Sequence, residues 1–296
     1  MVYHYFNQSK LGVTEAPRPA GIELPPEKSV IWPHGGLRGL SERAKRRGIN
    51  SPHAVACRTA APPRPSAPST TTRPSMTPAQ ETAKLLLDIK AVNFRPQEPY
   101  KLTSGWASPV YIDCRWVISF TEARRRIIEL GVEMLRRDAG LDGVDAVAGG
   151  ETAGIPYAAW ISEAASKPML YVRKKPKGFG RDAQIEGNLV EGSKVLLVED
   201  LASDGASKLN FVNALRGAGA EVSDAFVVFF YGVFKGALES LEKEGVTLRY
   251  LATWKDVLQV AEEGGYFDEA AIAGVREFLD DPEKWSLAHG GRGYED

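Results

Sequence analysis

The sequence predicts an α/β fold in which helices flank a mainly parallel, five-stranded sheet. Five short apolar runs alternate with helical segments, and this alternation is typical of parallel strands joined by crossover helices. The runs at 195–198 and 223–231 are continuously rather than alternately apolar, which indicates strands buried on both faces. The other three strands are predicted over 145–150, 169–173 and 247–253.

Residues 1–75 differ in composition from the rest of the chain. They hold eleven of the nineteen prolines and show no sustained apolar periodicity, so we predict a disordered, Pro/Arg-rich extension. Residues 76–296 form the predicted folded domain. A non-native start, with Met76 as the working initiator, is the favoured interpretation of the extension. A transit peptide is the alternative, because the segment contains Arg and Ser and few acids.

Charge and composition exclude several classes of protein. Residues 76–296 hold 26 basic and 34 acidic side chains, which argues against nucleic-acid binding, and no apolar stretch is long enough to span a membrane. Cys57 and Cys114 have no pairing or metal-binding spacing, as in a reducing compartment, so we expect a cytoplasmic protein. The body contains no histidine before His289, which excludes histidine-based triads and metal sites there.

Two helices are predicted ahead of the first buried strand. The first covers 77–91 and begins at Thr77, a good N-cap residue. The second covers 121–137, has an apolar face, and is expected to be capped by Thr121. Between them lies a turn-rich segment that contains a short strand over 110–113.

The stretch from Lys194 to Lys208 is the most informative part of the sequence. Its apolar strand ends in two adjacent carboxylates, Glu199 and Asp200, and a loop of small residues then leads into a helix. Ligands of open α/β sheets bind at the carboxyl ends of the strands, and such a loop beside a helix N-terminus suits a phosphate. The carboxylates suit the hydroxyls of a ribose, or a metal ion held beside them. The stretch therefore predicts a site for a sugar that carries a phosphate.

Two further loops follow predicted strands and suit anions. The Gly-rich loop over 150–156 precedes a helix and can bind an anion through its backbone N–H groups. Residues 173–181 hold five basic side chains beside Gly and Pro, although the body as a whole is acidic. A mobile cationic loop of this kind can close over an anionic group and then release it.

Residues 194–208 resemble the phosphoribosyl pyrophosphate (PRPP) motif of type I phosphoribosyltransferases, in which two acids and two variable residues precede Thr-Ala-Gly-Thr-Ala or a close variant. Here that last part is 203–207, Ser-Asp-Gly-Ala-Ser. Leu102 to Tyr111 match the pattern L-x-S-G-x-x-S-P-x-Y, which resembles the hood of orotate phosphoribosyltransferases. The resemblance covers most of residues 76–296 and implies the type I phosphoribosyltransferase fold with a small N-terminal hood.

The resemblance also implies the reaction. The 5-phosphoribosyl group would pass from PRPP to orotate, giving orotidine 5′-phosphate and pyrophosphate, a step of pyrimidine biosynthesis. The implied cofactor is Mg²⁺, held through substrate oxygens near Glu199 and Asp200 rather than by direct protein ligands. The implied partner is a second copy of the chain, in a homodimer whose catalytic loop reaches the neighbouring site.

Three groups of site residues carry over from the family's motifs. Stabilisation of the pyrophosphate is assigned to Arg173, Lys174 and Lys177. PRPP binding is assigned to Glu199, Asp200, Leu201, Ala202, Ser203, Asp204, Gly205, Ala206 and Ser207. Orotate binding is assigned to Thr103, Ser104, Gly105 and Ser203.

The sequence departs from the family's pattern at three positions. Thr103 stands where many relatives have Lys, Gly232 where many have an Arg that touches the base carboxylate, and Phe179 where many have His. Lys101 and Lys235 are the basic residues closest to the first two positions. One alternative is therefore a phosphoribosyltransferase for another base. A non-catalytic PRPP-sensing regulator is the alternative from another class, and the cationic loop disfavours it because a sensor has less need to stabilise a leaving group.

Overall fold

The structure is a computed structural model that describes residues 76–178, 184–203 and 206–294. The predicted extension over 1–75 lies outside the described residues. So do the predicted site residues Asp204 and Gly205, and so does Phe179 in the cationic loop.

The described elements alternate as the sequence predicts. The strands are β1 Val92–Phe94, β2 Tyr100–Lys101, β3 Ala107–Ser108, β4 Val110–Ile112, β5 Ala146–Gly150, β6 Met169–Val172, β7 Ile185–Glu186, β8 Val195–Ala202, β9 Asp224–Phe230 and β10 Thr247–Thr253. The helices are α1 Pro78–Asp88, η1 Cys114–Ser119, α2 Thr121–Asp138, η2 Leu141–Gly143, α3 Gly154–Ala165, α4 Ala206–Gly217, α5 Ala237–Lys243, α6 Trp254–Gly264, α7 Glu269–Asp280 and α8 Pro282–Ala288.

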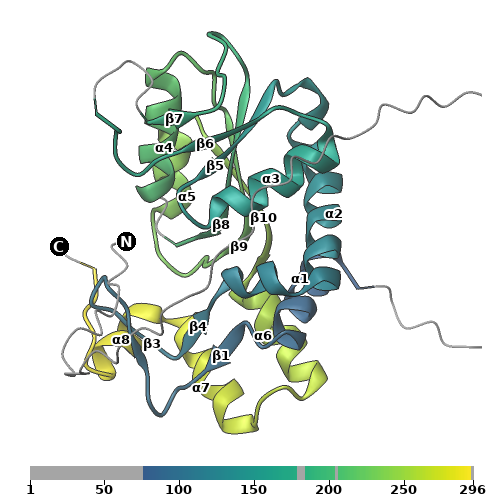
Figure 1. Cartoon of the computed structure of the whole chain (residues 1–296). Helices are drawn as coiled ribbons and strands as arrows, with labels where there is room; N and C mark the ends of the chain where they lie inside the picture. Colours follow the sequence, from purple (N-terminus) through teal and green to yellow (C-terminus); the bar gives the residue numbers. More distant parts are fainter. Residues whose placement is uncertain (1–75, 179–183, 204–205, 295–296) are drawn as a thin grey trace, which may run out of the picture. The chain divides into compact units, whose positions relative to one another are not determined.

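Within the described ranges, six strands form one sheet in the order β10-β9-β8-β5-β6-β7 (Figure 1). The first five are parallel, which confirms the predicted fold class. The sixth, β7, pairs antiparallel with β6 and was not predicted. A strand of two residues, Ile185–Glu186, is too short to show a hydrophobic period, so the sequence pattern could not reveal it.

The order of the strands places a topological switch point between β5 and β8, and the carboxyl end of these two strands is the expected ligand crevice. From β5 the chain first adds β6 on one side and then returns to add β8 on the other. The connections that leave these neighbouring strands thus run in opposite directions at their carboxyl ends. Such a topological switch point is where open α/β sheets bind their ligands.

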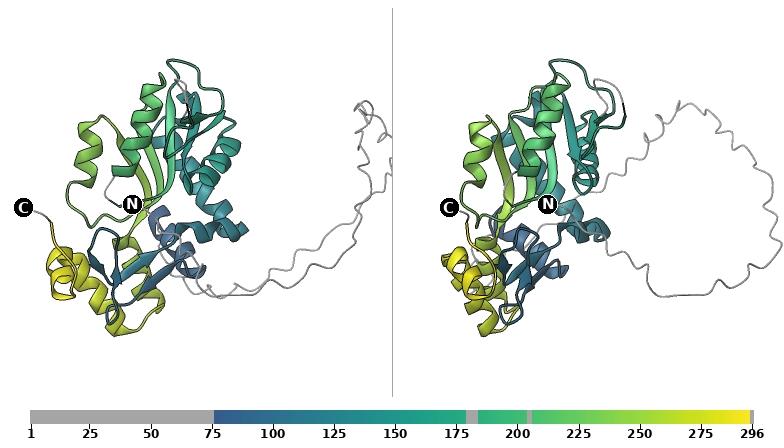
Figure 2. Two further views of the ribbon diagram at one scale, coloured as in Figure 1. Left: turned by 60° about the vertical axis from the view of Figure 1, so that its left-hand side comes forward. Right: turned by 90° about the vertical axis from the view of Figure 1, so that its left-hand side faces the viewer.

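Helices cover both faces of the sheet (Figures 1 and 2). Successive residues of β8 point to opposite faces. Leu196 lies in the apolar cluster that includes α2 and α3, whereas Leu197 lies in the cluster that includes α4 and α5. The buried strands therefore supply apolar residues to a core on each side. In the described part of the chain, no helix is both long and apolar enough to cross a membrane.

The hood is built from both ends of the domain. β1 pairs with β4 and β2 with β3, although only a strand over 110–113 was predicted in this segment, and α7 and α8 from the C-terminal end also pack on these strands (Figure 1). The Ser286 hydroxyl accepts a hydrogen bond from the backbone N–H of Ala107 at 2.9 Å. The rings of Trp106 and Tyr294 meet edge to face at 4.9 Å. The C-terminal aromatic residues thus pack within the domain. The hood was predicted from the N-terminal segment alone, whereas the observed hood also includes α7 and α8.

Two local predictions were wrong. Thr121 does not cap α2; it is the first helical residue, and Phe120 occupies the N-cap without a side-chain hydrogen bond. The apolar strand also does not end at Glu199. β8 continues to Ala202, because the residues after the acid pair keep their register with β9. The two carboxylates therefore project from the sheet itself.

Candidate active site

The acid pair of β8 lies at the switch point, against the start of the Gly-rich loop. The Glu199 side chain is buried, and its Oε1 atom packs on the backbone of Gly150 and Gly154. A Cβ atom added at Gly150 would overlap Oε1, and one added at Gly154 would lie 2.6 Å from it. The two glycines are therefore required for the close approach of β5 and α3 to the carboxylate.

A buried lysine faces this carboxylate from α4. Nζ of Lys208 lies 3.7 Å from Oε2 of Glu199, and both side chains are almost fully buried. Burial raises the pKa of Glu199 to about 8, and the adjacent Asp200 adds to this, whereas Lys208 and Lys174 act in the opposite direction. Burial also raises the pKa of Asp200, and Lys208 and Arg115 counteract it. Burial thus disfavours the charged forms of both acids, and the positive charges of Lys208, Lys174 and Arg115 partly offset this effect.

Two hydrogen bonds join the Gly-rich loop to the residues around the start of the cationic loop. The backbone N–H of Glu151 donates to the carbonyl of Val172 at 2.9 Å. In return, the Glu151 carboxylate accepts a hydrogen bond from the backbone N–H of Lys174 at 2.8 Å. The Gly-rich loop and the first predicted catalytic lysine, Lys174, therefore lie side by side at the carboxyl edge of the sheet.

The cationic loop is anchored on the β6–β7 ribbon. Gln184 and Arg173 exchange hydrogen bonds of 2.8 Å at the base of the loop. The Glu186 carboxylate lies 3.4 Å from Nη1 of Arg173 and 3.9 Å from Nζ of Lys177. Nε of Arg173 is buried without a hydrogen-bond partner in the described residues, whereas Lys177 is 71% exposed. Arg173 and Lys174 are thus placed at the crevice, and Lys177 extends from it into solvent.

The predicted phosphate loop leads from β8 directly into α4. Leu201 and Ala202 still belong to the strand, Ser203 follows it, and α4 begins at Ala206. The hydroxyl of Ser207, in the first turn of α4, accepts a hydrogen bond from Nζ of Lys208 at 3.2 Å. A helix N-terminus therefore faces the crevice beside the acid pair, as an anion site requires.

The predicted base-binding residues form the turn between β2 and β3. The Gly105 N–H donates a hydrogen bond to the Leu102 carbonyl at 2.8 Å. Gly105 has a φ of +87°, a backbone conformation that glycine adopts more readily than any residue with a side chain. The Gly105 carbonyl accepts a hydrogen bond from the backbone N–H of Arg292 at 3.1 Å. The turn is thus held by the C-terminal tail.

Lys235, one of the basic residues considered for base binding, is also tied to this tail. Its backbone N–H donates to the Tyr294 hydroxyl at 2.7 Å, and its Nζ lies 5.4 Å from the centre of the Tyr294 ring. Arg115, which follows β4, forms an ion pair with Asp113 at 2.6 Å, and its charge acts to lower the pKa of Asp200.

Sequence reasoning missed Lys208, the buried cation beside Glu199. Its position carried a signal, because Lys208 precedes Phe211, Val212 and Leu215 by three, four and seven residues. This spacing puts the lysine on the apolar stripe of α4. A charged side chain on a buried stripe needs a partner of opposite charge, which the preceding acid pair supplies. The roles of Glu151 and of the C-terminal tail had no comparable signal.

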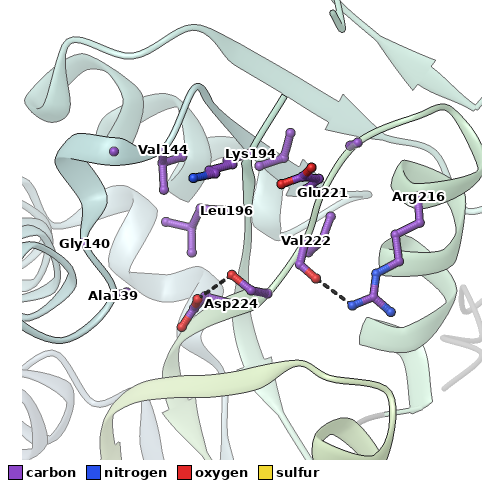
Figure 3. Close-up of a pocket in the computed structure, with 13 residues that line it drawn as sticks. Ala139, Gly140, Val144, Lys194, Leu196, Arg216, Glu221, Val222 and Asp224 are labelled. Atoms are coloured by element: carbon purple, nitrogen blue, oxygen red, sulfur yellow. Dashed lines mark hydrogen bonds between the residues drawn. The ribbon is translucent and has the colours of Figure 1, made fainter. Parts of the chain in front are cut away.

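A second hollow lies at the opposite end of the sheet (Figure 3). It is lined by residues at the amino ends of β8 and β9, among them Lys194, Glu221 and Asp224. The Arg216 guanidinium closes one side by donating to the Val222 carbonyl at 2.6 Å. None of the predicted site residues lines this hollow, so the crevice at the carboxyl ends is the candidate active site. Among the described residues, no group of three or more His, Cys, Asp or Glu side chains could hold a metal ion.

Comparison with known proteins shows the family of the chain. No model of a known protein family matches the chain. The chain is 51% identical over 210 residues to the orotate phosphoribosyltransferase of Cereibacter sphaeroides, a match that covers 71% of this chain and 90% of that protein. It is 49% identical over 215 residues to the orotate phosphoribosyltransferase of Sinorhizobium medicae, covering 73% of this chain and 93% of that protein.

Two solved structures share the fold. The orotate phosphoribosyltransferase from Aeropyrum pernix matches with a TM-score of 0.52 and 33% identity, covering 62% of this chain and 99% of that chain. The UMP synthase of Leishmania donovani matches with a TM-score of 0.59 and 29% identity, covering 68% of this chain and 42% of that chain. With the acid pair, the cationic loop and the hood in place, these similarities establish that the chain belongs to the orotate phosphoribosyltransferase family.

Proposed function

We propose that this protein transfers the 5-phosphoribosyl group of PRPP to orotate and releases pyrophosphate. The observation that carries the proposal is the acid pair at the switch point, with Glu199 buried and Asp200 half-buried, placed between the N-terminus of α4 and the cations that follow β6. PRPP has the matching groups: its ribose hydroxyls suit the acid pair, its 5′-phosphate suits the N-terminus of α4, and its pyrophosphate suits the cations after β6. In the reaction, the C1–O bond to pyrophosphate breaks and a bond from C1 to the base nitrogen forms.

Catalysis in this site needs no protein nucleophile. Glu199 and Asp200 accept hydrogen bonds from the ribose hydroxyls, and the loop from Ser203 to Ser207 binds the 5′-phosphate. Arg173, Lys174 and Lys177 stabilise the charge that develops on the departing pyrophosphate. The sugar passes through an oxocarbenium-like state, so the enzyme contributes positioning and charge stabilisation.

The hood turn supplies the base site. Thr103, Ser104 and Gly105 present their backbone and hydroxyl groups to the base, with Ser203 on the opposite side. The curated relatives at about half identity carry the name orotate phosphoribosyltransferase, which supports orotate over another base. The intact cationic loop supports an enzyme over a PRPP-sensing regulator.

Mg²⁺ fits this site through the substrate. The acid pair offers carboxylate oxygens beside the ribose, including the buried Oε1 of Glu199, which has no hydrogen-bond partner among the described residues. A hard ion such as Mg²⁺ prefers phosphate, hydroxyl and water oxygens, so PRPP itself provides most of its ligands. Bound there, the ion neutralises charge on the pyrophosphate.

The proposal includes a cytoplasmic homodimer in which the cationic loop serves the neighbouring site. Trp116, Ile118 and Phe120 expose large apolar surfaces on and just after η1, as a subunit interface would require. Lys177 is exposed and extends from the crevice of its own subunit. Residues 1–75 lie outside the folded domain of 76–296 in this proposal.

The decisive experiment measures turnover by the full chain and by a protein limited to residues 76–296. With PRPP, Mg²⁺ and orotate, both are expected to consume orotate, followed by its absorbance, and to release pyrophosphate at similar rates. Uracil, which lacks the carboxylate of orotate, is the matched control substrate. PRPP binding without orotate turnover would favour another base or the regulator, and activity in the full chain alone would contradict the proposed domain boundary.

PRPP binding is expected to depend on pH through Glu199. The folded-state pKa of about 8 lies above the ordinary value of 4.5, so this carboxyl is mostly protonated at pH 7 and must lose its proton to accept ribose hydroxyls. Affinity should therefore rise by up to about tenfold per pH unit from pH 6.5 and level off above pH 8. Calorimetry in two buffers of different ionisation enthalpy measures the proton release.

Glu199→Gln provides the control, because it removes this proton but keeps the shape of the side chain. The proton release that PRPP's own phosphates contribute is common to both proteins. Equal proton release by the wild type and Glu199→Gln would contradict the prediction.

The same pKa shift predicts how stability changes with pH in the absence of substrate. The unfolded chain loses the Glu199 proton near pH 4.5, whereas the folded chain retains it up to about pH 8. The folded state therefore binds more protons between these values, and this carboxyl makes the protein less stable as pH rises through that window.

A further inference from the structure

Lys208 occupies a position that would ordinarily belong to an apolar side chain. It lies in the first turn of α4 on the same stripe as Phe211, Val212 and Leu215, and it is only 5% exposed. Placing an ammonium group in such surroundings is costly unless the group is paired. The residue must therefore be compensated by the groups that it contacts.

Those groups belong to two different parts of the PRPP site. Nζ of Lys208 lies 3.7 Å from Oε2 of Glu199, which faces the ribose, and donates to the hydroxyl of Ser207, in the phosphate loop, at 3.2 Å. The ion pair is longer than a charge-assisted hydrogen bond, for which about 2.8 Å is usual. An ammonium group has three donors, so Lys208 can hold both groups at once.

Glu199 keeps one oxygen for a ligand. Oε1 is buried and has no hydrogen-bond partner in the described residues, and it lies on the backbone of Gly150 and Gly154. A buried carboxylate oxygen without a donor is costly. A ribose hydroxyl at the crevice would supply the missing donor. Oε2 is held by Lys208, so Oε1 is the oxygen that remains for the substrate.

We infer that Lys208 is a positioning residue for PRPP: its ammonium group fixes the Glu199 carboxylate and the Ser207 hydroxyl relative to each other, so that the ribose site and the 5′-phosphate loop form as one unit. The inference rests on the proposed function and assigns a role to a side chain that does not itself touch the substrate. It predicts that Lys208 governs PRPP binding and leaves the base site alone.

The charges around Glu199 make the role measurable by pH. Lys208 faces the carboxylate from α4, Asp200 from its own strand, and Lys174 from the loop after β6, whereas Gly150 and Gly154 carry no charge. Without Lys208, the remaining cation is Lys174, and the carboxylate would ionise only at higher pH.

The test replaces Lys208 by Met in the full chain, which keeps the length of the side chain and removes its charge. The KM for PRPP is expected to rise roughly 10- to 100-fold, whereas the KM for orotate should change by less than about twofold. The acid limb of kcat/KM for PRPP should move upward by about one pH unit. Lys194→Met, at an exposed lysine just before the amino end of β8, is the matched control and should behave as the wild type.

A double mutant keeps the inference testable if Lys208→Met alone does not fold. Lys208→Met with Glu199→Gln removes both charges, so the fold should return, with a PRPP affinity equal to that of Glu199→Gln alone. Multiplicative losses in the double mutant, or an unchanged KM and pH profile in Lys208→Met, would overturn the inference. If the wild type turns over no orotate, the proposed function fails, and PRPP affinity measured by calorimetry still decides the role of Lys208.

Discussion

Replacing Lys177 by Ala is expected to lower kcat by roughly 10²- to 10³-fold, with little change in the KM for orotate. Lys177 is largely exposed, and among the described residues its side chain is paired with Glu186 at 3.9 Å, so its removal should not disturb the fold. Its proposed work is done in the transition state, when negative charge accumulates on the leaving pyrophosphate. Steady-state kinetics with PRPP and orotate measure the effect. Lys175→Ala, in the same exposed loop, is the matched control and should retain most of the activity.

The same variant tests whether the loop serves the neighbouring subunit. Lys177→Ala and Asp200→Asn are each expected to be inactive as homodimers. A mixed dimer would contain one site with both defects and one site with neither. Co-expression of the two chains should then restore about a quarter of the wild-type activity, because half of the dimers are mixed and each has one intact site. Activity that stays at the level of the parents would place the loop in its own subunit's site.

Replacing Gly150 by Ala is expected to cost about 3 kcal/mol of the free energy of unfolding, because overpacked cores cannot relax freely. The added methyl group would overlap Oε1 of Glu199 and lie 2.6 Å from the ring of Phe211. Either the carboxylate or α4 has to move, and both carry the PRPP site. We therefore also expect PRPP affinity to fall more than about 100-fold. Urea unfolding and calorimetry measure the two effects.

Gly217→Ala is the matched control for this substitution. A methyl group there would meet no atom within 4 Å, and α4 ends at this residue. The substitution should leave stability and PRPP affinity close to those of the wild type. A Gly150→Ala variant with unchanged stability and affinity would show that the contact between β5 and Glu199 is looser than the structure indicates.

The sequence predicted the fold well where one pattern dominated. The strand predicted over 247–253 matched the observed β10 to the residue, although this edge strand mixes buried Leu248, Leu251 and Ala252 with the polar Thr247 and Arg249. The acid pair and the basic residues after β6 were predicted as site residues because carboxylates and cations at strand ends suit a phosphorylated sugar. This prediction rests on residue type and position in the chain and needs no knowledge of which atoms are in contact.

The sequence could not predict features that depend on distant parts of the chain. The hydrogen bond between Ser286 and Ala107 joins residues 179 positions apart, and no sequence pattern in either segment predicts that the two will meet. β7 was missed because two residues have no period. Lys208 was overlooked for a different reason: a lysine near a phosphate loop looks like a surface residue until its helical face is worked out.

The dual origin of the hood has a consequence for how the protein is made. The turn that contains Gly105 is among the first folded segments to be synthesised. The Gly105 carbonyl, however, accepts its hydrogen bond from the N–H of Arg292, which is synthesised much later. The parallel sheet can assemble while the ribosome is still working, since its last strand ends at Thr253. The hydrogen bond that holds the hood turn therefore forms only after the chain has been synthesised beyond Arg292. A nascent chain that has already folded its parallel sheet still lacks the completed hood.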